Sequence, residues 1–496
     1  MRQAGTDMLT ARSFAEITSD NPWQRAYWVT VALTSLNAAL TLMIWGFGVE
    51  HHLVNGIAAT SIGIVGIYCG GRMAVSGAML GALPYFLIGS AIFYGLGTIL
   101  AAIHTDAMSL LSFTGDVQRA MLAKLNLAHA FSIMVIVLAA GPFCAGMRPE
   151  AKPKDQPGVS GVIGSLEGSM TALLIASVAV ASLMWFTFPW PQNPVLAGML
   201  QLLRGLPLFT VLVGAAVWDR LTGPAKLMII LLTVSQALFG LLGLSKVLTL
   251  LPVLILVLGW WLNGTMARVA LIVTLVVGVG YFAAFAEFVS IGRLHTNYDP
   301  RLNGIWERVI ILSDSIDLFI DFQENDIAAN VELRFVTAPF EVYFMTLYDT
   351  GFPGDSLEAA KTILVPRVLW PEKPLFAPGN EFDLIFRGHL TENNLAVGFI
   401  AEGYWNYGWF GVLIVSLVAG VQIGWFTRKW LLFTEHGVWH IGIFILAPLV
   451  VYQAAWAEVN FVGGYVGGTV RFILIIMFID IMARLVLSYQ RSQLRV

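Results

Sequence analysis

Charge is scarce in this sequence, and its scarcity decides the class of protein. Asp, Glu, Lys and Arg make up 12% of the 496 residues, whereas a soluble domain carries about 25%. Apolar runs of about 20 residues recur along the chain, and each is long enough to cross a bilayer core of about 30 Å. Such runs indicate helices, because a membrane barrel would show shorter, alternating strands. The sequence therefore predicts an all-α, polytopic integral membrane protein.

Cysteine is equally scarce, which excludes a disulfide-rich extracellular scaffold. Cys69 and Cys144 are the two cysteines, and both lie near the cytoplasmic ends of expected spans, so we expect small buried side chains. The sequence also has no P-loop and no dinucleotide-binding glycine motif. The first 26 residues lack the apolar core and cleavage site of a signal peptide, so an uncleaved first span is expected from Ala26.

The apolar runs predict about twelve transmembrane helices. They cover residues 27–47, 53–71, 78–103, 126–146, 169–190, 195–217, 227–244, 247–263, 269–288, 396–427, 437–456 and 468–487. Lys and Arg concentrate in alternate short loops, and this bias places both termini in the cytoplasm. Five regions follow: a cytoplasmic tail at 1–26, transmembrane helices 1–9 at 27–288, a large external loop at 289–395, an embedded or re-entrant helix with transmembrane helices 10–12 at 396–487, and a cytoplasmic tail at 488–496.

Acidic charge gathers in the external loop. Residues 289–395 hold 16 of the 31 acidic residues and 8 of the 28 basic residues, a net charge of −8. A segment of this length is rarely a plain linker, and apolar patterning at 305–320 and 331–348 predicts amphipathic helices on or near the membrane. The loop also contains LVPRVLWPEKPLFAPGNEF at 364–382, whose prolines predict a rigid backbone.

The apolar run after the external loop is too long for one straight span. Residues 395–427 as a single helix would measure roughly 50 Å, well beyond a bilayer core. Gly403, Gly408 and Gly411 are the expected places for a break. We therefore expect a short helix over 395–407 that leads into a span beginning near Trp409.

The external loop holds a set of arginines, and arginine binds phosphate through paired hydrogen bonds. They are Arg293, Arg301, Arg308, Arg334, Arg367 and Arg387. Ten residues separate Arg293 from Gly304 and Arg387 from Gly398, and both pairs lie where the loop meets the membrane. Others are expected to pair with acids, and Arg308 beside Glu307 is a candidate surface charge.

Two further arginines fall inside predicted spans. Arg204 lies in the sixth span and Arg471 near the outer end of the twelfth. A charge in lipid is costly and usually faces a partner or a cavity. These two residues therefore either pair with buried acids or line an outward-facing cationic cavity together with the loop arginines.

Candidate proton acceptors flank the break in the long apolar run. Glu402 lies in GFIAEGYWNYGWFG, and His389 and Glu392 precede it. A carboxylate or imidazole at this place could accept a proton from a sugar hydroxyl, or Glu402 could pair with an arginine and His389 lie on the surface. Glu381 and Asp383 are residue types that hold divalent cations, but no other ligand cluster supports them, and we expect no metal and no cofactor.

Aromatic residues are dense in the same region. They are Trp370, Phe376, Phe382, Phe386, Tyr404, Trp405, Tyr407 and Trp409. Such residues form interfacial belts in membrane proteins, and they also stack on the faces of sugars. Trp370 and Tyr404 are therefore candidates for contact with a glycan.

Two stretches resemble the Wzy-type polysaccharide repeat-unit polymerases, in the branch of the O-antigen and enterobacterial common antigen polymerases. PRVLWPEKP at 366–374 is similar to a Pro-rich loop of that branch, and AVGFIAEGYWNYGWFG at 396–411 is similar to the embedded helix that follows it. The Arg-x10-Gly spacing is also similar to one found in such polymerases. The remaining spans are similar in number and in the presence of one large external loop.

The resemblance implies a GT-C-like fold in the bacterial inner membrane, with a periplasmic loop. Its members transfer a glycan from one polyprenyl-diphosphate-linked oligosaccharide to a sugar hydroxyl of another, alongside a flippase and a chain-length regulator, without nucleic acid. Arg367 and Arg387 would hold the donor diphosphate, with Arg293, Arg301 and Lys373 as further ligands. Glu402 or His389 would act on the acceptor.

Three other functions are compatible with the sequence. An O-antigen-ligase-type transferase would share the lipid-diphosphate chemistry and the large loop. A lipid-linked oligosaccharide flippase or other transporter would carry charge across many spans, whereas charge here concentrates in one loop. A non-catalytic membrane subunit of an export complex would tolerate the loss of single arginines.

Overall fold

A computed structural model describes residues 21–48, 52–78, 81–103, 115–147, 170–188, 205–243, 245–263, 305–310, 337–363, 397–432 and 460–468, with a few single positions between them. Every regular element in these ranges is a helix, and none of them is a strand. Six of the described helices are long and apolar enough to cross a membrane. The predicted class, a helical multi-pass membrane protein, is therefore confirmed.

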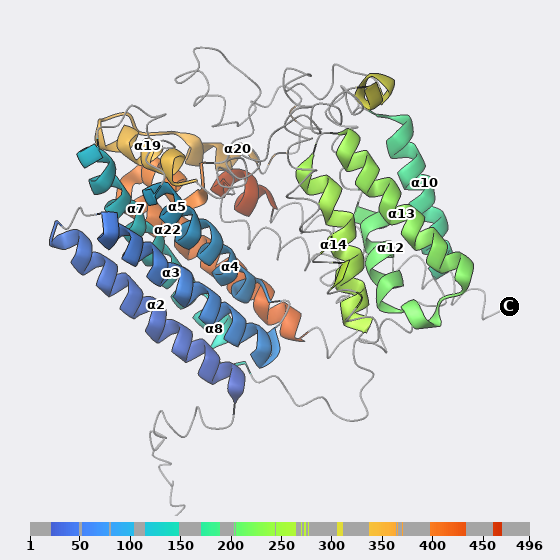
Figure 1. Cartoon of the computed structure of the whole chain (residues 1–496), viewed down its shortest axis with the longest axis horizontal. Coiled ribbons are helices and arrows are strands. Elements are labelled where there is room, and N and C mark those ends of the chain that lie inside the picture. Colours follow the sequence, from blue (N-terminus) through green and yellow to red (C-terminus); the bar gives the residue numbers. More distant parts are fainter. Residues whose placement is uncertain are drawn as a thin grey trace, which may run out of the picture.

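The described helices form two groups, each with its own core of buried apolar side chains (Figure 1). The first group contains α2 (Pro22–Gly46), α3 (His52–Met73), η1 (Ala74–Ala78), α4 (Ala82–Ser90), η2 (Ala91–Leu96), α5 (Gly97–Ile103), α7 (Gly115–Ala139), α8 (Gly141–Cys144), α19 (Ala338–Asp349), η5 (Ser356–Ala359), α20 (Ala360–Ile363), α22 (Phe399–Leu432) and η6 (Phe461–Val466). The second contains α10 (Met170–Phe186), α12 (Gly205–Ala216), η3 (Trp218–Arg220), α13 (Gly223–Leu242) and α14 (Lys246–Asn263).

The candidate spans agree with the sequence analysis in part. They are Pro22–Gly46, Leu53–Ser76, Ala82–Ala101, Ala120–Ala139, Gly223–Leu242 and Phe399–Arg428, with shorter apolar helices at Met170–Phe186, Gly205–Ala216 and Leu248–Trp260. Residues 243–245 separate α13 from α14, as expected. The spans predicted at 269–288, 437–456 and 468–487 lie almost entirely outside the described residues.

Small residues let the helices of the first group approach closely. A Cβ on Gly70 would lie 2.7 Å from the Pro84 carbonyl oxygen, and one on Gly424 would lie 2.7 Å from Cα of Ala140. Ser132 on α7 and Ser416 on α22 share a buried hydrogen bond of 2.6 Å. Small residues and hydrogen-bonded hydroxyls are the usual means of helix association where lipid supplies no hydrophobic driving force.

The start of α7 differs from the prediction. The fourth span was expected at 126–146 with Lys124 in an outer loop, whereas α7 begins at Gly115 and Lys124 lies within it. The polar first turns of α7 are stable because α19 packs beside them and offers Asp349 to Lys124. Local apolarity does not reveal a partner that lies more than two hundred residues later in the chain.

The long helix α22 breaks where a break is expected. Tyr407 (φ −140°, ψ 23°) and Gly408 (φ 59°, ψ −143°) leave the helical region, and a positive φ favours glycine. A Cβ on Gly411 would lie 1.8 Å from the Gly403 carbonyl oxygen, although residues eight apart in a straight helix are about 12 Å apart. The chain therefore folds back at Gly408, and residues 399–406 pack against the beginning of the following helix.

One expectation for the predicted external loop is met in part, and another needs correction. The segment 331–348 was expected to form an amphipathic helix on or near the membrane, and α19 forms a helix from Ala338 that is buried from Ala338 to Met345 except at Phe340. Arg308 is buried rather than a surface charge. Its guanidinium donates to the Leu242 carbonyl at 2.7 Å and lies 5.5 Å from the Phe188 ring, so it binds the end of α13.

Candidate functional site

Polar side chains gather where α7, α19 and the first part of α22 meet. We call this set the polar cluster. Its members are Lys124, His129, Glu341, Asp349, Ser356, Glu402, Tyr404 and Asn406. It combines two acid–base pairs with a fully buried carboxylate, and it lies at the end of the first group where α19 is seen (Figure 1).

Glu402 joins three segments that are far apart in sequence. Its side chain is fully buried, one carboxylate oxygen accepts from the Ser356 hydroxyl at 3.0 Å, and the other accepts from the Phe461 backbone N–H. Phe461 opens the short helix η6, so a carboxylate there receives a donor that the helix itself leaves unpaired. Glu402 thus joins the starts of η5 and η6 to the first turn of α22.

Asn406 extends the same network by one turn. Its amide nitrogen donates to the Ser356 hydroxyl and to the Glu402 carbonyl, both at 2.8 Å, and its amide oxygen accepts from the Leu357 N–H at 3.0 Å. Trp405 donates to the Phe352 carbonyl at 3.2 Å. The short helix 399–406 is therefore joined by hydrogen bonds along its length to residues 352–357.

His129 and Glu341 form a second buried pair. The His129 Nε2 and Glu341 Oε2 atoms are 2.5 Å apart, and the side chains are 0% and 1% exposed. The Tyr94 ring stacks on the imidazole with a centroid distance of 3.9 Å, and Thr337 donates to the other Glu341 oxygen at 3.2 Å. The pair joins α7, which contains a candidate span, to α19.

Gly398 shows why a glycine is needed beside this pair. Its φ is +81°, and a Cβ there would lie 2.8 Å from Oε1 of Glu341. A side chain would therefore meet both a strained backbone conformation and the buried carboxylate. This is the glycine that follows Arg387 by ten residues, and its role in the described chain is to admit Glu341.

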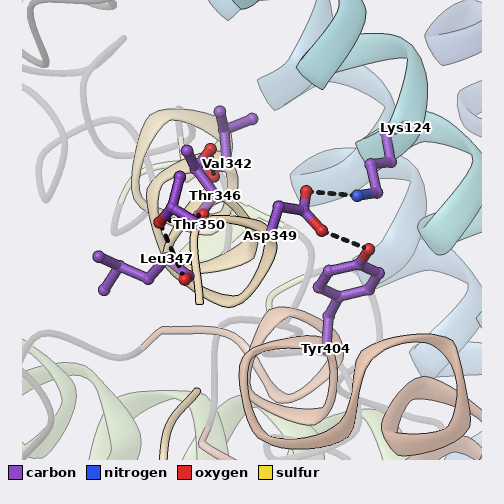
Figure 2. Close-up of polar contacts among 7 residues, drawn as sticks. All are labelled: Lys124, Val342, Thr346, Leu347, Asp349, Thr350 and Tyr404. Carbon is purple, nitrogen blue, oxygen red and sulfur yellow. Dashed lines mark hydrogen bonds and ion pairs between the residues drawn. The ribbon is translucent and has the colours of Figure 1, made fainter. Parts of the chain in front are cut away.

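Lys124, Asp349 and Tyr404 form the third contact of the polar cluster (Figure 2). One Asp349 oxygen is 2.5 Å from the Lys124 ammonium, and the other accepts from the Tyr404 hydroxyl at 2.9 Å. The Lys124 ammonium also lies 4.5 Å from the Tyr404 ring centroid. Both charged side chains keep some exposure, 15% and 27%, so this contact lies at the exposed edge of the polar cluster.

Replacing Asp349 with alanine is expected to destabilise the protein by about 1 kcal/mol, because partly exposed ion pairs contribute little each and one hydrogen bond is lost as well. The measurement is the thermal unfolding midpoint of detergent-purified protein. Thr350→Ala is the control, since the Thr350 hydroxyl bonds only to carbonyls of its own helix, at Thr346 and Leu347 (Figure 2). Equal midpoints for the two variants would mean that the contacts of Asp349 do not stabilise the protein.

The structure describes part of the predicted site. Glu402 and Tyr404 lie in the polar cluster. Trp370 is described only as a 40% exposed side chain. The remaining predicted site residues lie outside the described part of the chain: Arg204, Arg293, Arg301, Arg367, Lys373, Arg387, His389 and Arg471.

The buried His129–Glu341 pair and the Lys124–Asp349 contact were not predicted from the sequence. An ionisable residue inside an apolar run is by default a functional candidate, and this rule would have singled out His129. Nothing local to Glu341 or Asp349 indicates a partner on α7. Among the described residues, no three His, Cys, Asp or Glu side chains are grouped as metal ligands.

Comparison with protein-family models, curated proteins and solved structures gives no match to this chain. The class defined by fold and site is therefore a helical, multi-pass membrane protein with a polar cluster at one end of its first helix group. Chemically, such a cluster can orient an acid–base pair and exclude water from it.

Proposed function

We propose that this protein polymerises polyprenyl-diphosphate-linked oligosaccharide repeat units at the outer face of a bacterial inner membrane. It acts as a metal-independent glycosyltransferase with a GT-C-like arrangement of about twelve spans, and both termini lie in the cytoplasm. The acceptor is the sugar of a second lipid-linked repeat unit, and a flippase and a chain-length regulator work in the same pathway.

The observation that carries the proposal is the structure of residues 397–411, the stretch that resembles the polymerases. The chain reverses at Gly408, so the short helix before it lies against the true span instead of extending it. That helix is joined by polar contacts to residues 352–357 of the external segment and to η6. A lipid-linked glycan needs such a place, where external polar groups meet the end of a membrane bundle.

The chemistry fits the residue types of the external loop. The donor is already activated, because its glycan leaves a diphosphate that stays anionic as the bond breaks. Guanidinium groups can stabilise that charge without a metal, and Arg367 and Arg387 are assigned this role, with Arg293, Arg301 and Lys373 beside them. The acceptor hydroxyl must lose a proton, so a base is required.

Arg367→Ala and Arg387→Ala are expected to lower polymer formation by about 10²-fold or more, because loss of one charge-stabilising donor has that effect in transferases. The measurement is the length distribution of the host's surface polysaccharide on a gel, for wild type, a deletion strain and the variants. Lys361→Ala is the control, since Lys361 is an exposed cation of the same segment. A ladder that is unchanged by the deletion contradicts the proposal.

Transport is the second candidate, and the buried His129–Glu341 pair favours it. A buried ionisable residue on a membrane helix, as His129 is on α7, is typical of the proton relays of carriers. The same gel separates the candidates. Loss of the carrier leaves unit-length lipid-linked glycan on the cytoplasmic face, loss of a ligase leaves long lipid-linked chains, and loss of a polymerase leaves single repeats on the outer face.

A further inference from the structure

Only one of the two ring nitrogens of His129 forms a hydrogen bond among the described residues. Nε2 meets Glu341, while Nδ1 has no hydrogen-bond partner among the described residues and is shielded from solvent. A neutral imidazole that donates its Nε2 proton to a carboxylate keeps Nδ1 as a bare acceptor. Buried polar atoms are rarely left this way, and an exception calls for a specific reason.

Two other buried polar atoms, one on α7 and one on α5, are also without partners in the described chain. They are Asn126 Oδ1 and Thr98 Oγ1. Asn126 precedes His129 by three residues on α7, and Thr98 follows Tyr94, which stacks on His129, by four residues. Asn126 lies one turn from His129 on α7, and its amide nitrogen donates to the Asn55 carbonyl of α3 at 3.3 Å. Thr98 lies in α5, which contacts α7.

The backbone opposite His129 is itself irregular. Tyr94 lies in η2, a π-helix between α4 and α5. Single π-helical turns inside α-helices occur frequently at functional sites. The region therefore combines an irregular helix, a stacked aromatic ring, a carboxylate-oriented imidazole and unpaired hydroxyl and amide oxygens.

We infer that Glu341 and His129 are the base of the transfer reaction, and that Thr98 and Asn126 help to bind the acceptor sugar hydroxyl beside Nδ1. The inference rests on the proposed function. The hydroxyl proton moves to Nδ1, the hydroxyl oxygen forms the new bond to the donor sugar, and the bond from that sugar to the diphosphate breaks with its electron pair on the lipid diphosphate. Glu341 stabilises the imidazolium formed.

The arrangement follows the logic by which a carboxylate fixes the tautomer of a catalytic histidine and supports its charged form. Since His129, Asn126 and Thr98 are closed off from solvent, the acceptor has to part α7 from α5 or from α19 to reach them. Lys124 and Asp349, at the outer end of the same α7–α19 contact, lie on the side from which an external glycan arrives.

The test compares His129→Gln with wild type and with Ser132→Ala. Glutamine keeps an N–H for Glu341 but has no basic nitrogen, so His129→Gln is expected to purify and unfold like wild type while polymer formation falls about 100-fold. Ser132→Ala removes a buried hydroxyl one turn further along α7, from its pair with Ser416, and is expected to leave polymer formation near wild type. Thr98→Val, which removes only a hydroxyl, is expected to reduce it about 10-fold.

Chemical rescue distinguishes a base from a structural pair. Membranes with His129→Ala are supplied with lipid-linked single repeat units extracted from the deletion strain, with and without imidazole. Partial recovery of polymer with imidazole supports the inference. A folded His129→Gln protein that polymerises like wild type overturns it, whereas wild-type membranes that fail to extend the supplied units overturn the proposed function itself.

Discussion

Replacing Glu402 with alanine is expected to destabilise the protein by about 3 kcal/mol or more. The substitution leaves the Ser356 hydroxyl and the Phe461 N–H buried without their acceptor, and each orphaned donor costs about 1–3 kcal/mol. Loss of these two hydrogen bonds also weakens the attachment of η6 and of residues 352–357 to the short helix 399–406. The thermal unfolding midpoint in detergent is expected to fall by several degrees, and the yield of membrane-inserted protein to fall with it.

Glu402→Gln separates a structural from a chemical role for this residue. The glutamine oxygen can accept from the Phe461 N–H, and its amide group can donate to the Ser356 hydroxyl, which retains a lone pair although Asn406 also donates to it. We expect this variant to keep most of the stability that alanine loses. If this variant also keeps the polysaccharide ladder, the role of Glu402 is structural. If it unfolds like wild type but forms no polymer, Glu402 acts in the reaction, which contradicts the assignment of the base to His129.

The fold class could be predicted because it follows from composition. Scarce charge and long apolar runs are properties of the chain itself. Because backbone N–H and C=O groups in lipid must form hydrogen bonds within the protein, such runs form helices. The break at Gly408 could be predicted for a similar reason, since a helix over 395–427 exceeds a bilayer and glycine adopts the left-handed conformation found there.

The errors arose where a polar residue owes its place to a distant partner. Lys124 is inside a helix because Asp349 neutralises it, and Arg308 is buried because the Leu242 carbonyl accepts from it. The buried face of α19 is apolar apart from Glu341, which is stable there because His129 lies opposite. The two residues of each of these contacts are more than sixty positions apart in the sequence. A local pattern of hydropathy or charge therefore cannot predict them.

In the candidate site, too, local features could be predicted and long-range contacts could not. Glu402 was singled out because it stands in a motif and beside a predicted break, both of which are local. His129 and Glu341 are 212 residues apart, and each is a single ionisable residue in otherwise apolar sequence. Only the packing of α7 against α19 brings them together, so sequence reasoning could have nominated each one but not the pair.

Replacing Gly411 with alanine is expected to open the reversal at Gly408 and destabilise the protein by about 3 kcal/mol, at the upper end of the usual cost of overpacking. The added Cβ would lie 1.8 Å from the Gly403 carbonyl oxygen, which is backbone and cannot rotate away. Gly403→Ala is expected to cost less, because its Cβ would lie 2.8 Å from the Val415 side chain and 2.9 Å from the Gly411 carbonyl oxygen, contacts about 1 Å longer than the one at Gly411.

Gly71→Ala supplies the matched control on α3. A Cβ there meets nothing within 4 Å, so alanine is expected to be neutral or to stabilise by up to about 1 kcal/mol through the unfolded chain. Thermal unfolding in detergent should therefore rank the three variants with Gly411→Ala lowest, Gly403→Ala between and Gly71→Ala at or above wild type. Equal midpoints for Gly411→Ala and Gly71→Ala would mean that residues 399–406 do not pack against the following span. The polar contacts of Glu402 and Asn406 would then lose the backbone arrangement on which they depend.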